Sequence, residues 1–366
     1  MTEVPDLYLG LMSGTSLDGV DAALVDFSDT HPRLLASHYQ PYPEPLKQAL
    51  LALHQPDHDE LHRAHLLANQ LAHEYGTATH CLLRQANVQA AQVQAIGCHG
   101  QTVRHRPASG YTIQLNNGAL LAELTGIHVV TDFRSRDIAA GGQGAPLVPA
   151  FHDQVLRHPA IHRVILNIGG IANVTDLAPG QPTTGFDCGP GNLLLDSWIA
   201  RHQGLPYDES GIWAEGGQVI PALLQRLLAD PYFTAPPPKS TGRDLFTLAW
   251  LERQLHGKEA AQDVQATLLA LTTDSITDAI RRHCSGAEEI YVCGGGAHNG
   301  ALMARLRQSL PDCRIEKSEA LGIAADWMEA MAFAWLARQT LHLQAGNLPA
   351  ATGARHPCVL GAIYPA

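Results

Sequence analysis

The sequence predicts an α/β protein that consists of two similar halves. Short apolar runs alternate with longer stretches whose apolar residues recur at helical spacing, a rhythm typical of sheets covered by helices. In each half an apolar strand enters a glycine-containing turn and continues directly into a second strand, over 7–27 and again over 163–177. Because each of these elements precedes a long α/β stretch, we expect a duplicated domain with a cleft between the copies.

The patterns assign the individual elements in order. Strands are expected at 7–12, 20–27, 93–98, 127–131, 163–168, 171–177 and 288–293. Helices are expected at 60–86, 191–203, 218–229, 262–283, 300–310 and 327–343. The length of 366 residues allows about two domains, which we place at residues 1–132 and 133–366.

Composition narrows the class of protein. The net charge is −11 and no long basic run is present, so the sequence shows no nucleic-acid-binding footprint. The seven cysteines are odd in number and include no C-x-x-C pair, which favours free thiols in a reducing compartment. No secretion signal is evident, and no apolar run approaches the ~18 residues of a membrane span. We therefore expect a cytoplasmic protein without a membrane partner.

The first turn, MSGTSLDG, has two interpretations. Gly14 and Gly19 have the spacing of a P-loop, but Val20 and Asp21 stand where Lys and Ser/Thr belong, and no G-x-S-x-G elbow is formed. The turn is either a hairpin connection made of ordinary turn residues or a nest of amides that binds phosphate. In the second case Asp18 could hold a divalent cation.

Two further glycine turns raise the same question. Gly169–Gly170 is either a tight hairpin or a second element that binds the phosphate groups of a ligand. Gly294–Gly296 follows a buried strand and precedes a helix that begins near Asn299, which favours a nucleotide contact. It is not a G-x-G-x-x-G motif in an N-terminal βαβ unit, so a dinucleotide site is not indicated.

Several acids and bases are candidates for chemistry. Asp187 lies in a Gly/Pro turn before an apolar helix, where it is either a positioned general base or a capping residue. Arg134, Arg136 and Asp137 crowd before a glycine-rich stretch, which suits either ligand recognition or a surface turn with ion pairs. Glu329 is a lone acid within WMEAMAFAW. The histidines between 54 and 73 lack an H-E-x-x-H pattern and are interpreted as a solvated helix face.

Together these motifs resemble the anhydro-N-acetylmuramic acid kinase family. The resemblance rests on the segments GLMSGTSLDGVD, GCHGQT, DFRSRDIAAGGQGAPLVPAFH, LNIGGIANV, GFDCGPGNLLLD, PKSTGRDLF, VCGGGAHN and WMEAMAFAWLA, in this order between Leu7 and the closing LGAIYPA. Cys188 stands where many members have Thr. The resemblance implies an actin-like ATPase/sugar kinase fold, with two RNase H-like domains around a central nucleotide cleft. The helix at 327–345 is then able to pack back on the first domain.

The resemblance also implies roles for the residues above. ATP would bind the first phosphate hairpin, the second hairpin and the adenosine turn: Ser13, Gly14, Thr15, Ser16, Leu17, Asp18, Gly19, Val20, Gly169, Gly170, Gly294, Gly295 and Gly296. Thr102, Arg136 and Gly189 would contact the sugar, Asp187 would act as general base, and Glu329 would help to position water. Mg²⁺ would bind near Asp18, directly or through water. The partners are small molecules, and a homodimer is one oligomeric state that the resemblance leaves open.

The implied reaction converts 1,6-anhydro-N-acetylmuramic acid into N-acetylmuramic acid 6-phosphate, in peptidoglycan recycling and amino-sugar catabolism. Asp187 would deprotonate a water that attacks C1, while O6 leaves C1 and takes the γ-phosphoryl group in place of a general acid. Three alternatives remain: a glycosidase that pairs Asp187 with Glu329, a non-catalytic actin-like ATP-binding protein, and acyl transfer through Ser13 or Ser16.

Overall fold

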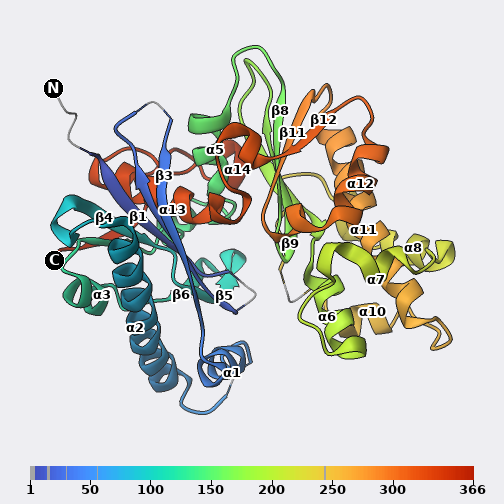
Figure 1. The fold of residues 1–366 in the computed structure, drawn as a ribbon, viewed down its shortest axis with the longest axis horizontal. Helices are drawn as coiled ribbons and strands as arrows, with labels where there is room; N and C mark the ends of the chain where they lie inside the picture. The colour runs from blue at the N-terminus through green and yellow to red at the C-terminus, as the bar shows by residue number, and fades with distance from the viewer. Residues whose placement is uncertain (1–4, 15–16, 30, 56, 243–244) are drawn as a thin grey trace. The chain divides into compact units, whose positions relative to one another are not determined.

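The chain forms two compact units in the computed structural model, which describes residues 5–14, 17–29, 31–55, 57–242 and 245–366. The first unit combines Met1–Val155 with Trp327–Ala366, and the second is Leu156–Asp326 (Figure 1). Both units mix strands and helices, so the predicted α/β class is confirmed. In the part of the chain that is described, no helix is both long and apolar enough to cross a membrane.

The first unit is built on a six-stranded sheet. Its strands are β1 (Leu7–Met12), β2 (Gly19–Asp26), β3 (Arg33–Pro41), β4 (Val93–Cys98), β7 (Val129–Thr131) and β13 (Ala362–Tyr364), in the order β13-β7-β4-β1-β2-β3. β1 pairs antiparallel with β2 and parallel with β4. A separate two-stranded sheet joins β5 (Gln101–Arg106) to β6 (Tyr111–Leu115).

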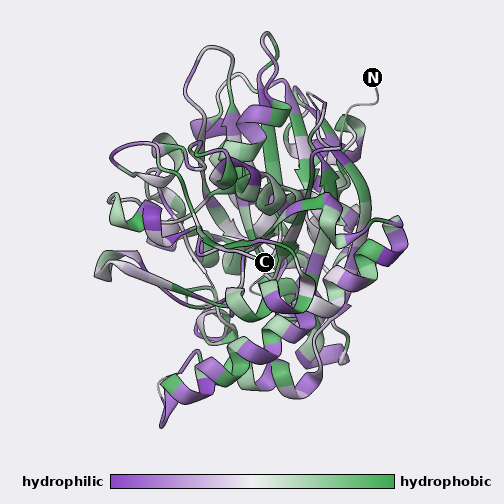
Figure 2. Cartoon of the chain, turned by 90° about the vertical axis from the view of Figure 1, so that its left-hand side faces the viewer, coloured by the Kyte–Doolittle hydropathy of each residue, from purple (hydrophilic) through white to green (hydrophobic). Residues whose placement is uncertain are grey.

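Helices of the first unit cover both faces of the sheet. They are α1 (Glu44–Ala52), α2 (Glu60–Ala86), α3 (Gly118–Thr125), α4 (Ser135–Ala139), α5 (Val148–Leu156), α13 (Met328–Leu341) and α14 (Pro349–Thr352). Leu9 and Leu11 of β1 join Leu71 and Tyr75 of α2 in one hydrophobic core. Alternate strand residues point the other way, and a Cβ on Gly10 would lie 2.8 Å from the Ala334 nitrogen of α13. Coloured by hydropathy, the strands are largely hydrophobic, whereas both colours alternate along the helices (Figure 2).

The boundary predicted between residues 132 and 133 is wrong, because residues up to Val155 belong to the first unit. The reason is a buried carboxylate, Asp137, which binds the C-terminal tail of the chain. Its Oδ1 accepts hydrogen bonds from Asn347 Nδ2 at 2.6 Å and from Thr352 Oγ1 at 2.7 Å. Its Oδ2 accepts one from the Gly144 amide at 2.8 Å. These bonds hold 133–155 and the tail together, and the helix expected to return to the first domain does so as α13.

The second unit is built on a five-stranded sheet. Its strands are β8 (Arg163–Ile168), β9 (Ile171–Leu177), β10 (Thr184–Pro190), β11 (Glu289–Cys293) and β12 (Arg314–Lys317), in the order β10-β9-β8-β11-β12. Its helices are α6 (Leu193–Gln203), α7 (Ile212–Glu215), α8 (Pro221–Leu228), α9 (Pro231–Thr234), α10 (Leu248–Glu252), α11 (Ala261–His283) and α12 (Gly300–Ser309). Short 3₁₀ turns complete both units at Ala90–Gln92, Pro107–Ser109, Glu209–Gly211, Gly295–His298, Ser318–Leu321 and Ala325–Trp327.

The two sheets share one topology. In each, three antiparallel strands in sequence are followed by two strands that continue parallel to the first, which gives the order 3-2-1-4-5. This is the strand order of RNase H-like domains, so the prediction of two similar halves is confirmed. β13 is an added edge strand in the first unit. The nucleotide cleft expected between the domains stays a prediction.

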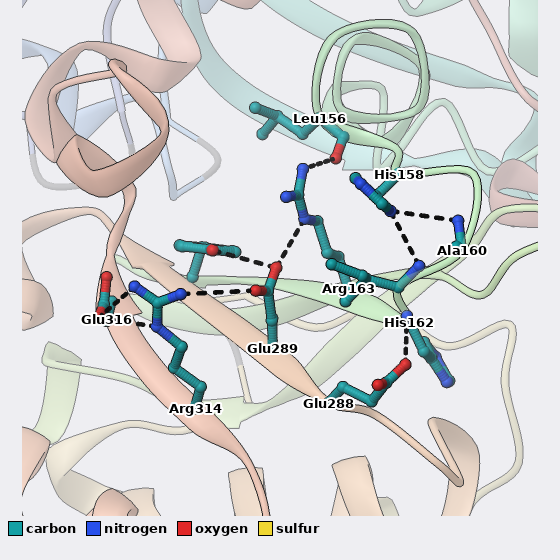
Figure 3. A network of polar contacts seen from close by, with 11 residues as sticks. Leu156, His158, Ala160, His162, Arg163, Glu288, Glu289, Arg314 and Glu316 are labelled. Carbon is teal, nitrogen blue, oxygen red and sulfur yellow. Dashed lines mark hydrogen bonds and ion pairs between the residues drawn. The ribbon is translucent and has the colours of Figure 1, made fainter.

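An ion-pair network connects the amino ends of the parallel strands in the second unit (Figure 3). Glu289 at the start of β11 pairs with Arg163 at the start of β8, with 2.8 Å between Nε and Oε2. Arg314 at the start of β12 lies between Glu289 and Glu316. The glycine turns follow the opposite, carboxyl ends of β8 and β11, where α/β sheets usually bind ligands.

Candidate active site

The first glycine turn connects β1 to β2 and is anchored by a buried leucine. Leu17 is fully buried and has a φ of +60°, an uncommon conformation for a residue with a side chain. Next to it, the Asp18 carbonyl accepts the Tyr42 amide at 2.9 Å, while the Asp18 side chain is exposed. Thr15 and Ser16, both expected to bind ATP, lie outside the described residues. The described part of the turn is therefore a fixed backbone element rather than a loose loop.

Gly19 and Val20, at the end of the predicted ATP-binding segment, already belong to β2. Both are buried, and a Cβ on Gly19 would lie 2.7 Å from the Tyr39 ring of the neighbouring strand. Gly19 is thus explained by close strand packing. Whatever these two residues contribute to a ligand would come from their main chain.

Ser13 supports the turn through its side chain. Its hydroxyl is buried, lies 2.8 Å from the Tyr75 hydroxyl and donates to the Gly100 carbonyl at 3.1 Å. The Tyr42 hydroxyl extends this chain by donating to Tyr75 at 3.3 Å. Burial raises the pKa of Tyr42 and Tyr75, so both phenols stay protonated. The Ser13 hydroxyl is therefore engaged within the protein, which argues against Ser13 as an acyl-transfer nucleophile.

His99 and Arg134 form a second support. The sequence singled out Arg134 as a possible ligand contact or surface ion-pair residue, and gave His99 no role. Arg134 donates from Nε and Nη2 to His99 Nε2, at 3.1 and 2.8 Å. Burial and the adjacent Arg134 lower the pKa of His99 to about 3, so the ring is neutral at physiological pH. Since Nε2 accepts from Arg134, the ring proton resides on Nδ1, which donates to the Ser13 carbonyl at 3.2 Å.

Glu329 lies in the first turn of α13, in the same unit. Burial raises the pKa of its carboxyl, and the charge of Arg134 partly opposes that shift. Arg134 therefore acts electrostatically on Glu329 while it binds His99. A carboxyl with a raised pKa can hold or release a proton nearer to neutral pH than an ordinary glutamate.

The two predicted sugar contacts of this unit have different surroundings. Thr102 follows Gln101 in β5, and its hydroxyl accepts from Gln114 Nε2 at 3.1 Å. Gln101 Nε2 donates to the Gly14 carbonyl at 2.9 Å, so Thr102 lies one residue from a support of the first turn. Arg136 is exposed, and the described residues include no ion pair to it. Arg136 therefore lies at the surface, as the alternative of a surface turn expects, but the ion pairs that this alternative expects are not found among the described residues, and Asp137 is buried.

In the second unit, Gly169–Gly170 connects β8 to β9 and binds the start of α6. The Asn192 amide donates to the Gly169 carbonyl at 2.8 Å, and the amides of Gly191 and Leu193 donate to the Gly170 carbonyl at 2.9 and 3.1 Å. A Cβ on Gly191 would overlap the Gly169 carbonyl oxygen, so only glycine permits this approach. The second turn is thus held by backbone groups.

The Gly294–Gly296 turn follows β11 beside the same hairpin. Gly294 has a φ of +77°, and a Cβ there would lie 2.9 Å from the Ile168 carbonyl. A Cβ on Gly296 would lie 2.5 Å from Ile168 Cβ. Gly295, in contrast, is exposed, and the atom nearest to a Cβ on Gly295 would be Asn192 Nδ2, at 3.7 Å. Only the middle glycine is free of packing constraints. A flat ligand could lie against it.

Asp187 lies at a bulge of the edge strand β10, opposite Asn173 of β9. It is half-buried, and its Oδ2 accepts the Thr241 amide at 2.8 Å. Gly189, also in β10, is buried, and a Cβ there would lie 2.7 Å from the Phe233 ring. Pro190 of β10 pairs with Ile171 of β9, which directly follows Gly170. Asp187, three residues before Pro190, is therefore at the same end of the sheet as Gly169–Gly170.

The structure thus gathers the predicted residues in two groups. The first turn, Thr102 and Glu329 belong to one unit, and both later glycine turns belong with Asp187 to the other. A joint action of Asp187 and Glu329 stays a prediction. The supports His99, Tyr232 and Lys239 were missed because each acts on a residue distant in sequence. The GCHGQT segment includes His99 and the PKSTG segment includes Lys239, whereas Tyr232 lies outside both.

A resident metal does not fit this arrangement. Within the ranges described above, no group of three His, Cys, Asp or Glu side chains could hold a metal ion. Mg²⁺ commonly keeps several waters and binds one or two carboxylates plus substrate phosphates. Exposed Asp18 at the first turn therefore fits a magnesium ion that arrives with a nucleotide.

The comparison with known proteins was made over the whole chain. The family model described as anhydro-N-acetylmuramic acid kinase matches residues 6–366. The chain is 58% identical to the anhydro-N-acetylmuramic acid kinase of Nitrosomonas europaea over 98% of this chain and 99% of that one. It is 54% identical to the one of Pseudomonas putida, over 98% and 99%.

The chain is also similar in fold to solved structures of low sequence identity. A ROK family glucokinase from Streptomyces griseus, in complex with glucose and AMPPNP, is 13% identical over 91% of this chain and 99% of that chain, with a TM-score of 0.42. The sequence relatives and the family model, which extend over nearly the full length of the chain, identify it as a member of the anhydro-N-acetylmuramic acid kinase family.

Proposed function

We propose that the protein is a kinase that opens 1,6-anhydro-N-acetylmuramic acid with water and transfers the γ-phosphoryl group of ATP to O6. The products are N-acetylmuramic acid 6-phosphate and ADP. This reaction would serve peptidoglycan recycling in the cytoplasm. The relatives that are 52–58% identical carry the name of this activity. The observation in the structure that supports the reaction best is the restrained carboxylate of Asp187.

Asp187 would act as the general base. Opening the internal ether requires a water at C1, and a carboxylate that is fixed in orientation can accept a proton from that water as it attacks. The Thr241 amide binds Oδ2 at 2.8 Å and favours the ionised form. Gly189 and Arg136 would contact the sugar, with Arg136 offering an exposed guanidinium to the lactyl carboxylate. Thr102 would contact a hydroxyl.

O6 would leave C1 and attack the γ-phosphorus, so the bond to C1 breaks as the bond to phosphorus forms. The proton of the attacking water goes to Asp187, and Glu329 would hold that water in line. Because the phosphoryl group accepts the departing oxygen, no separate general acid is needed. Phosphoryl transfer depends mostly on positioning and on the stabilisation of charge, which the glycine turns would provide.

ATP would bind the three turns through main-chain amides. The first turn, from Ser13 to Val20, and Gly169–Gly170 would hold the phosphates, and Gly294–Gly296 would hold the adenosine. Mg²⁺, when bound with ATP, neutralises phosphate charge, and Asp18 would hold it directly or through water. The backbone hydrogen bonds of Gly169–Gly170 and the contacts of the described residues of the first turn support this assignment.

One labelling experiment tests the reaction. The protein is incubated with anhydro-N-acetylmuramic acid, Mg-ATP and ¹⁸O-labelled water. We expect ADP in step with sugar phosphate, the label at C1 of the sugar, and none in the phosphoryl group. Ring opening without ATP would favour a glycosidase instead, and product without label would refute water attack.

A substitution tests the base. Asp187→Asn keeps the shape of the side chain but cannot accept the proton, so we expect turnover to be lost while ATP still binds. Asp274→Asn is the matched control, because Asp274 is also half-buried in the second unit and forms an ion pair with Arg305. Turnover of Asp187→Asn equal to that of the control would exclude Asp187 as the base.

A further inference from the structure

Asp187 is contacted by a segment of which the proposed function uses only the Thr241 amide. The segment includes α9 and the PKSTG sequence after it, up to Thr241. Three of its residues bind Asp187 or one another, and we call Tyr232, Lys239 and Thr241 the brace. β10 is an edge strand, so only one side of β10 is paired with another strand, which is β9. The brace supplies partners on the other side.

The brace restrains Asp187 at three points. The Asp187 amide donates to the Lys239 carbonyl at 3.1 Å. The Asp187 carbonyl accepts from the Tyr232 hydroxyl at 2.9 Å, and the carboxylate accepts from the Thr241 amide at 2.8 Å. Both main-chain polar groups and one carboxylate oxygen are therefore fixed by a single segment.

The brace is itself held in place. Lys239 Nζ donates to the Tyr232 carbonyl at 3.0 Å and lies 4.7 Å from the centre of the Tyr232 ring. Burial lowers the pKa of Lys239. The Tyr232 ring contacts Phe246 with 5.4 Å between ring centres, and Phe246 contacts Trp250 at 5.2 Å. An aromatic cluster thus links α9 to α10 and limits movement of the Tyr232 hydroxyl.

Charge adds to this restraint. Asp187 and Tyr232 interact electrostatically, and burial with the charge of Asp187 raises the pKa of the Tyr232 phenol. Tyr232 therefore remains a hydrogen-bond donor throughout the physiological range. Asp187 is thus contacted by the Tyr232 hydroxyl, by the main chain of Lys239 and by the Thr241 amide. General packing does not require this combination of contacts.

We infer that Tyr232, Lys239 and Thr241 are positioning residues that set the orientation and proton affinity of the Asp187 carboxylate. The inference rests on the proposed function of Asp187 as the base. A displacement of about 1 Å in a reacting group can lower a rate by about 10²-fold. Loss of one brace contact should therefore change the chemical step more than nucleotide binding.

The test compares Tyr232→Phe with Tyr291→Phe. Each substitution removes one tyrosine hydroxyl from the second unit, and the Tyr291 hydroxyl donates to Glu289 at 3.1 Å near the amino end of the sheet. We expect Tyr232→Phe to lower kcat by about 10- to 100-fold with the KM for ATP within about twofold. Tyr291→Phe should keep the kcat of the wild type. Lys239→Met, which keeps the stem and removes the ammonium group, should lower kcat in the same direction.

A second readout does not depend on turnover. The titration of the Asp187 carboxyl is followed by ¹³C NMR, with the resonance assigned by its absence in Asp187→Asn. In Tyr232→Phe the pKa of Asp187 should rise, because a loosened brace weakens the Thr241 hydrogen bond to the charged form. Tyr291→Phe should leave it unchanged, and denaturant unfolding reports the folded fraction of each variant.

The outcomes separate the two proposals. Wild-type protein without ATP-dependent turnover refutes the proposed function, while a raised pKa in Tyr232→Phe still supports the brace. Turnover in the wild type, together with unchanged kcat and pKa in Tyr232→Phe, overturns the brace and leaves the function intact. An equal loss in Tyr232→Phe and Tyr291→Phe also overturns it, because the effect would then be general destabilisation.

Discussion

Gly295 allows the proposed adenosine contact to be tested apart from the stability of the turn. The three glycines at 294–296 adjoin one another, yet only Gly295 is exposed and has its nearest neighbour for a Cβ at 3.7 Å. That distance is an ordinary van der Waals contact. Gly295→Ala should therefore fold like the wild type, and any loss of ATP affinity must come from the ligand.

The expected magnitudes differ along the turn. For Gly295→Ala, the free energy of unfolding should change by no more than about 0.5 kcal/mol. For Gly296→Ala, a Cβ at 2.5 Å from Ile168 Cβ overpacks the site and should cost about 1–3 kcal/mol. For Gly294→Ala, the φ of +77° with a ψ of 172° is a conformation that strains other residues, at a cost on the order of 1–3 kcal/mol.

The assays are denaturant unfolding for stability and ATP titration for binding. If adenosine lies against Gly295, the added methyl should weaken ATP binding at least about tenfold, which corresponds to roughly 1.4 kcal/mol. The KM for the sugar should stay near that of the wild type. Unchanged ATP affinity in Gly295→Ala would refute the contact. Full stability of Gly296→Ala would refute the packing argument.

Two further predictions concern the supports of the turns. The pKa of His99 in the folded protein is about 3, below the ordinary value of 6.5. Between these two pH values the folded state therefore binds fewer protons than the unfolded state. The free energy of unfolding should fall as the pH drops from 6.5 towards 3, by up to ~1.4 kcal/mol per pH unit. Urea unfolding of His99→Gln should show a shallower fall over this window, and an identical slope would contradict a buried neutral His99. Gly191→Ala, which brings a Cβ against the Gly169 carbonyl, should raise the KM for ATP and lower stability. Gly300→Ala, with its nearest neighbour at 3.6 Å, is the control, and equal behaviour of the two would contradict the docking of α6 on the hairpin.

Local patterns were sufficient to predict the longest helices and the central strands of both sheets, but not the shorter helices or the edge strands. The helix expected at 60–86 is α2, Glu60–Ala86, because its apolar spacing continues without a break until Asn87 ends it in a left-handed conformation. Both strand–turn–strand elements also follow from adjacent residues. Strands β3, β5, β6, β10, β12 and β13 were not predicted. Several of them lie at sheet edges or in the small sheet, where alternation is weak.

The misplaced boundary and the missed supports have a common physical cause. Asp137 binds groups 210 and 215 residues away, and His99 binds the Ser13 carbonyl 86 residues away. Tyr232 reaches Asp187 over 45 residues. No local periodicity encodes a contact at such separations. The residues proposed to contact a ligand could be inferred from their type, whereas the residues that hold them in place required the tertiary structure.

The two hairpins to which we assign phosphate binding arise from the same strand order but are fixed by different chemistry. In its described part the first is held mostly by side chains, since His99, Gln101 and Tyr75 all bind Ser13 or Gly14, and the Tyr42 amide adds one main-chain bond to the Asp18 carbonyl. The second is held by main-chain amides of Gly191 to Leu193 on the carbonyls of Gly169 and Gly170.

It follows that substitutions should affect the two hairpins unequally. In the first hairpin, a side-chain change can loosen the described part of the turn, so under the proposed function it should adjust nucleotide affinity in small steps. In the second hairpin, a change of glycine or of the start of α6 acts on the backbone of the turn. We therefore predict that the first hairpin, which is connected through Arg134 to Glu329, is the one at which nucleotide binding and the handling of water are coupled.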